Sequence, residues 1–147
     1  MVIGVGNADR GDDAAGLIAV RRVRQCAPGV RTIERSGDIV GLLEKWEGEE
    51  RVILIDATCS GAAPGTVHRL NAHEAPVPFL GFRGSTHSWG VGEAVELARV
   101  LGRLPARLVV YGIEGASFTE GDELSPAVAS AVEEVVRRVT NEVNGHA

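Results

Sequence analysis

The chain has 147 residues and a mass of 15.5 kDa, the size of one ordinary domain. Its 15 basic and 20 acidic side chains give a net charge of −5, which argues against a nucleic-acid-binding protein, because such proteins need a basic face for the phosphates. With 44% hydrophobic residues and a mean hydropathy of +0.05, the composition is neither that of a disordered chain nor that of a membrane protein. We therefore expect a globular domain with no nucleic-acid or membrane partner.

The start of the chain has no basic region ahead of a long apolar stretch, so we expect no signal peptide and a cytoplasmic protein. The two cysteines, Cys26 and Cys59, form no Cys-x-x-Cys pair, which is typical of idle thiols in a reducing compartment.

The first half of the chain alternates between apolar runs and helical patterns. Unbroken apolar runs are typical of strands that are covered on both faces, and apolar residues at helical spacing indicate an amphipathic helix. In chain order these patterns predict a strand over residues 1–5, a helix over 12–24, a strand over 30–34, a helix over 39–46 and a strand over 52–55.

The second half continues the alternation. Residues 66–70 alternate in polarity after Pro64-Gly65, which predicts an edge strand, and residues 71–85 have no period and predict a long loop. A helix over 91–101 and a strand over 108–111 follow. In the last helix, over 126–143, Ser125 is the predicted N-cap and Pro126 lies in the first turn.

Alternation of this kind predicts an α/β fold with helices on both faces of the sheet. The expected architecture is a three-layer α/β/α sandwich around a mostly parallel, twisted sheet of about five strands. Ligands of open α/β sheets bind outside the carboxyl ends of the strands. At these ends the sequence has Asp9, Asp12 and Asp13 after the first strand, Asp38 after the second and Asp56 after the third, and His87 leads into the third helix.

A nucleotide site is one interpretation of the first loop. Gly4 and Gly6 fit a Gly-x-Gly-x-x-Gly fingerprint, but Asp9 stands at its third position. The carboxylates of this loop would lie where a pyrophosphate must bind, and like charges repel there. This alternative is therefore the weaker one.

A divalent-metal site fits the charges better. Carboxylates and one imidazole that converge at strand ends are ligands for a transition metal. We expect Asp12 to cap the first helix, which leaves Asp13 available, and Asp56 and His87 to complete the set. Taken alone, a histidine such as His87 is more often structural than a metal ligand. Of the other histidines, His68, His73 and His146, only His73 is expected near the site.

A series of short motifs resembles the hydrogenase maturation proteases, in order and over nearly the whole chain. In this sequence they read Gly4-Val5-Gly6-Asn7, Gly11-Asp12-Asp13-x-x-Gly16, Ile55-Asp56-Ala57, Pro64-Gly65-Thr66, Thr86-His87, Tyr111-Gly112-Ile113-Glu114 and Leu124-Ser125-Pro126. Gly115 departs from the pattern, because many relatives have proline there.

The resemblance implies one endopeptidase domain over residues 1–147 with a three-layer α/β/α fold. Such proteins remove a C-terminal extension from the large-subunit precursor of nickel–iron hydrogenases after nickel insertion. The family's metal-contacting residues correspond to Asp13, Asp56 and His87, and Asp38 matches a further acidic position. The implied metal is nickel carried by the substrate, and other divalent metals are expected to be able to substitute for it.

The resemblance leaves several mechanisms open. Asp13, Asp56 and His87 would bind the nickel of the precursor, with Asp38 as general base. The alternatives are an all-carboxylate mechanism, as in an aspartyl protease, in which His87 only orients, and a thiol nucleophile at Cys59. A non-cleaving metal-dependent chaperone for the precursor has nearly the same residue requirements.

Overall fold

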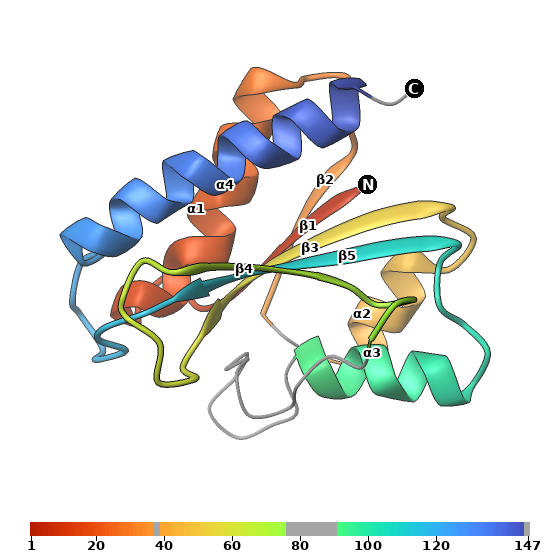
Figure 1. The fold of residues 1–147 in the computed structure, drawn as a ribbon, viewed down its shortest axis with the longest axis horizontal. Helices are drawn as coiled ribbons and strands as arrows, with labels where there is room; N and C mark the ends of the chain where they lie inside the picture. Colours follow the sequence, from red (N-terminus) through yellow and green to blue (C-terminus); the bar gives the residue numbers. More distant parts are fainter. Residues whose placement is uncertain (37–38, 76–90, 146–147) are drawn as a thin grey trace.

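The structure, a computed structural model, describes residues 1–36, 39–75 and 91–145. These residues form a five-stranded sheet with the strand order β2-β1-β3-β5-β4 (Figure 1). In chain order the elements are β1 (Val2–Val5), η1 (Gly11–Ala14), α1 (Ala15–Cys26), β2 (Thr32–Arg35), α2 (Ile39–Trp46), β3 (Arg51–Thr58), β4 (Val67–Asn71), α3 (Val91–Val100), β5 (Arg107–Glu114) and α4 (Pro126–Gly145).

The sheet is mostly parallel. β2, β1, β3 and β5 pair in parallel, and β4 runs antiparallel to β5 along one edge. The carboxyl ends of β1, β3 and β5 therefore meet at one edge of the sheet and their amino ends meet at the other. This arrangement confirms the predicted α/β class and the predicted edge strand.

Helices cover both faces of the sheet, as Figure 1 shows: α1 and α4 lie on one face, and α2 and α3 lie on the other. Alternate side chains of β3 divide between the two layers. Ile53 and Ile55 pack with α1 and α4, whereas Val52 and Leu54 pack with α2 and α3. The unbroken apolar runs in the sequence thus supply two cores from single strands, which is the pattern expected of a doubly covered sheet.

Three predicted boundaries near the carboxyl edge were wrong. β3 continues past Ile55 to Thr58, so Asp56 lies inside the strand instead of after it. β5 likewise continues past Tyr111 to Glu114. The first helix begins as a separate 3-10 turn, η1, before α1 starts at Ala15. In each place polar residues take part in regular backbone structure that apolar periodicity alone does not mark. None of the helices in the described parts of the chain is long and apolar enough to cross a membrane.

Gly16 permits α1 to approach the sheet closely. A Cβ atom at this position would lie 2.3 Å from the carbonyl oxygen of Ile55 and 2.4 Å from that of Val5. Both neighbours are backbone atoms of central strands, so neither can move aside without disturbing the sheet. The glycine therefore sets the distance between α1 and the strands β1 and β3, and with it the position of η1.

We expect Gly16→Ala to lower the free energy of unfolding by at least about 2 kcal/mol, because overpacking against the backbone outweighs the better helix propensity of alanine. Urea denaturation at pH 7 measures the change. Gly29→Ala is the matched control: nothing lies within 4 Å of its Cβ position, so its stability should change by no more than about 0.5 kcal/mol. Equal stability of the two variants would contradict the close approach.

Candidate functional site

Buried polar side chains gather at the carboxyl edge of the sheet. Among the described residues, the buried charged side chains all lie here, namely Asp12, Asp13, Asp56 and Glu114, and so does buried Thr58. Burying a charge costs free energy unless partners or a bound cation compensate it. Four buried carboxylates at one edge thus mark this edge as the candidate site.

Asp13 lies in η1, directly after the loop that follows β1, and only 4% of its surface is exposed. The loop folds back onto it: the Asn7 amide donates to the Asp13 carbonyl (3.2 Å), and the Asp13 amide donates to the Arg10 carbonyl (3.0 Å). A Cβ atom at Gly6 would lie 2.0 Å from the Asp13 carbonyl oxygen, so only glycine permits this path. The first loop therefore fixes the backbone of Asp13 beside the strand ends.

Asp56 is fully buried on β3, next to β1 in the sheet. Its Oδ1 accepts a hydrogen bond from the Ala57 amide at 2.8 Å. η1, which follows β1, packs against β3, so Asp13 and Asp56 lie at the same edge of the sheet. The two carboxylates are hard oxygen donors suited to a divalent cation.

The other two predicted site residues, Asp38 and His87, lie outside the described residues. Over residues 1–36, 39–75 and 91–145, no three His, Cys, Asp or Glu side chains are grouped so that they could hold a metal ion. The structure thus brings Asp13 and Asp56 to one edge of the sheet.

Asp12 does not cap a helix, contrary to the sequence prediction. Its carboxylate accepts hydrogen bonds from the amides of Ala116 (2.7 Å), Ser117 (3.0 Å) and Ser125 (2.7 Å), and from the Ser125 hydroxyl (2.8 Å). Burial raises the pKa of the Asp12 carboxyl, but the bonds from Ser125, Ser117 and Ala116 outweigh this effect and hold the pKa below its ordinary value of 3.8. The ionised side chain thus joins η1 to the loop between β5 and α4.

Ser125 precedes α4 as predicted, and its carbonyl accepts the Ala129 amide (2.9 Å). Its hydroxyl, however, donates to Asp12 instead of capping α4. The position was therefore predicted correctly and the partner of the side chain was not.

Glu114 is another buried carboxylate of this edge, and no role for it was predicted from the sequence. It is 2% exposed and accepts from the Thr58 hydroxyl (2.9 Å), the Ser60 amide (2.7 Å) and the Ser60 hydroxyl (2.7 Å). Burial raises the pKa of Glu114, and the bonds from Ser60, Thr58 and His68 outweigh it, so that the pKa lies below 4.5. Its position at the end of an apolar strand, the same signal that pointed to Asp56, could have identified it.

His68, which was not expected near the site from the sequence, belongs to this cluster. Its Nε2 lies 3.2 Å from Glu114 Oε1. An ionised carboxylate only accepts hydrogen bonds, so Nε2 carries the proton. Gly112 pairs with both Asp56 on β3 and His68 on β4, so these three residues form one row across the sheet. Because paired residues face the same side, His68 and Asp56 flank Gly112, which has no side chain to separate them.

In the sequence Cys59 lies between Thr58 and Ser60, which both donate hydrogen bonds to Glu114. Its thiol is exposed and forms no disulfide, and the same holds for Cys26.

The family model for the hydrogenase maturation proteases matches residues 30–142 of this chain. The hydrogenase 2 maturation protease of Escherichia coli is 29% identical over 143 residues, which cover 95% of this chain and 87% of the relative. The hydrogenase expression/formation protein HupD of Bradyrhizobium diazoefficiens is 31% identical over 137 residues, which cover 90% of this chain and 71% of the relative.

A solved structure of a similar protein has the same fold. The solution structure of an endopeptidase from Escherichia coli superimposes with a TM-score of 0.81 at 25% identity, and the match covers 98% of this chain and 93% of that chain.

The two depressed carboxyl pKa values predict a loss of stability in acid. Near pH 4 the unfolded chain protonates the Glu114 and Asp12 carboxylates more readily than the folded chain does. The free energy of unfolding therefore falls as the pH drops below 4.5 for Glu114 and below 3.8 for Asp12. Above about pH 6 both groups are ionised in either state, and their contribution is constant. Urea denaturation at several pH values between 3 and 7 should give this profile, with a shallower acid slope in Glu114→Gln.

Asp12→Asn should lower the free energy of unfolding at pH 7 by about 3 kcal/mol, because an amide group cannot accept all four of the hydrogen bonds. Exposed Glu120→Gln is the control for a change of charge alone and should leave both the stability and the acid slope unchanged.

An acid slope of Glu114→Gln equal to that of the unsubstituted protein would contradict the role given to Glu114.

Proposed function

The chain belongs to the hydrogenase maturation protease family and is a hydrogenase maturation endopeptidase, and from this premise we propose that it removes the C-terminal extension of a nickel–iron hydrogenase large-subunit precursor after nickel insertion. Cleavage is then a signal that the metal is in place. The hydrolysis requires a means of recognising the loaded precursor and a means of activating water.

One observation carries the proposal: two carboxylates are buried at the carboxyl edge of the sheet, Asp56 on β3 and Asp13 in η1, which packs against β3. Burial in a protein makes a carboxylate a stronger site for a cation, because the surrounding water that competes for it is removed. Nickel accepts oxygen and imidazole ligands, so Asp13, Asp56 and His87 suit the open coordination positions of a substrate-borne nickel ion. Binding to the precursor then depends on the metal that the precursor holds.

The cleavage itself needs a base near the bound precursor. We assign this role to Asp38, which takes a proton from a water molecule. The oxygen of that water molecule attacks the carbonyl carbon of the scissile peptide bond at the same time. The bond between that carbon and the amide nitrogen then breaks, and the proton passes to the departing amine. The substrate's nickel can polarise the scissile carbonyl if that group lies next to it.

The proposal predicts a cleavage that depends on nickel. Incubation of a nickel-loaded large-subunit precursor with this protein should release one C-terminal peptide, measured as a loss of intact mass, whereas a nickel-free precursor should keep its full mass. Asp13→Asn, Asp56→Asn and His87→Ala should each reduce the cleavage rate by at least about 100-fold, because each removes a ligand to the substrate's metal.

Two controls separate this mechanism from its alternatives. Asp122→Asn makes the same substitution at an exposed residue and should cleave normally, and Cys59→Ser should also retain full activity if no thiol attacks the peptide. Equal cleavage of loaded and nickel-free precursors would contradict recognition through the metal. Binding of the loaded precursor without any change of mass would identify a metal-dependent chaperone instead.

A further inference from the structure

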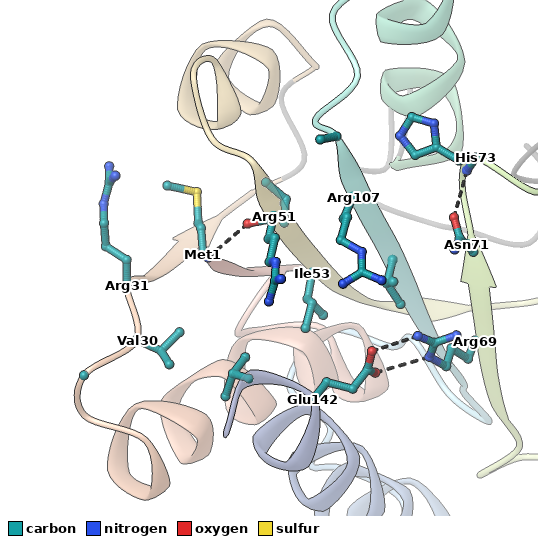
Figure 2. Close-up of a pocket in the computed structure, with 15 residues that line it drawn as sticks. Met1, Val30, Arg31, Arg51, Ile53, Arg69, Asn71, His73, Arg107 and Glu142 are labelled. Carbon is teal, nitrogen blue, oxygen red and sulfur yellow. Dashed lines mark hydrogen bonds and ion pairs between the residues drawn. The ribbon is translucent and has the colours of Figure 1, made fainter. Parts of the chain in front are cut away.

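A second concave site lies at the opposite edge of the sheet. Figure 2 shows this pocket, of about 670 Å³, between the amino ends of β1, β3 and β5, the strand β4 and the last turns of α4. Arg51, which begins β3, lines the pocket, and Asp56 lies five residues further along the same strand. At about 3.3 Å per residue the two are roughly 16 Å apart, so a small ligand in this pocket cannot reach the carboxyl edge.

The floor of the pocket is apolar. Ile53 and Val109 remain 8% and 9% exposed, whereas Ile55 and Ile113, which follow them on the same face, are fully buried. Val30, after α1, and Val143, in the last turn of α4, are half-buried beside them. The core thus opens to solvent at this point and offers an apolar surface of ligand size.

The rim of the pocket is basic. Arg31, Arg51, Arg69 and Arg107 all line it, and Glu142 is the acidic residue among the described residues that do so. Arg51 and Arg107 pair directly in the register of β3 and β5, so their side chains lie on the same face of neighbouring strands. Like charges at paired positions destabilise a sheet. In Figure 2 both side chains extend over Ile53 toward α4, whereas Arg31 points away from the pocket.

The acidic groups near the pocket are already engaged. Glu142 accepts two hydrogen bonds from Arg69, at 2.7 and 3.2 Å, and a third from the Tyr111 hydroxyl. Arg31 pairs with Glu49 at 3.3 Å. The Arg107 side chain makes no hydrogen bond or ion pair with any described residue. Positive charge is therefore in excess among the residues that line the pocket, four arginines against one glutamate, in a chain whose net charge is −5.

We propose that this pocket binds a small organic anion, with a phosphate or carboxylate group between Arg51 and Arg107 and an apolar body on Val30, Ile53, Val109 and Val143. Guanidinium groups bind both kinds of oxyanion through paired N–H donors. The volume lies within the range of small-molecule sites, about 300–1,000 Å³. A bound anion would offset the positive charge of the two arginines.

Isothermal titration calorimetry of the untagged protein at low ionic strength tests the proposal with three probes: ATP, citrate and pyrophosphate. We expect saturable one-site binding of ATP or citrate, tighter than that of pyrophosphate, which has no organic body. ATP binding tighter than citrate assigns a phosphate ligand, and the reverse order assigns a carboxylate ligand. Failure of all three to bind below about 1 mM, or tightest binding of pyrophosphate, would overturn the proposal.

Matched variants locate the site. Arg51→Gln/Arg107→Gln should weaken binding at least tenfold, whereas Arg22→Gln/Arg137→Gln, which removes the same charge from residues outside the pocket, should weaken it less than twofold. Without ligand, the pocket variant should have a melting temperature close to that of the unsubstituted protein if these arginines serve a ligand and not the fold. Equal weakening by both variants, or a melting temperature of the pocket variant several degrees lower, would show that these arginines serve the fold or the overall charge instead.

Amide chemical-shift mapping gives an independent location. Addition of the tightest of the three probes should shift the amides of residues 29–31, 51–53 and 107–109 and leave those of Asp13, Asp56 and Glu114 in place. Shifts confined to the carboxyl edge would overturn the assignment.

Discussion

The carboxyl edge of the sheet depends on the hydrogen bonds that the buried carboxylate of Asp12 accepts. This carboxylate accepts four hydrogen bonds from the segment after β5, including two from Ser125 at the start of α4. Hydrogen bonds to a buried carboxylate are strong, and leaving such a charge without partners is costly. The backbone of the next residue, Asp13, is therefore held between the first loop and this anchor.

Glu114 plays the corresponding part for the end of β3, because it accepts hydrogen bonds from Thr58 and Ser60. Each proposed carboxylate ligand, Asp13 and Asp56, thus has a buried carboxylate near it that fixes its segment.

The two edges of the sheet carry opposite charge, which the net charge of −5 conceals. The carboxyl edge has four buried carboxylates, and the amino edge has four arginines around one pocket. Parallel strands produce this separation directly, because residues that begin different strands gather at one edge and residues that end them gather at the other. A cation carried by a substrate is attracted to the first edge and an anion to the second. The proposed endopeptidase function and the proposed anion site therefore use different ends of the same strands.

The sequence predicted the layers well, because apolar runs and helical periodicity depend on local residues alone. α2 was predicted at its observed bounds, and β4 was predicted as an edge strand from its alternation. The family resemblance, carried by motifs at the strand ends, is confirmed by the match over residues 30–142. The partners of Asp12 and Glu114 lie between 46 and 113 residues away in the chain, so no local pattern could identify them. For the same reason no local pattern brings Arg51 and Arg107 together: they become neighbours only through the register of β3 and β5.

The proposed function requires Asp13 and Asp56 to bind the nickel of the precursor. X-ray absorption at the nickel edge can detect this binding in a rapidly frozen mixture of this protein with the nickel-loaded precursor. We expect additional oxygen or nitrogen ligands at nickel relative to the precursor alone. These ligands should persist with Asp122→Asn and be lost when Asp13 and Asp56 are both replaced by asparagine. A nickel spectrum that does not change when the complex forms would contradict the account.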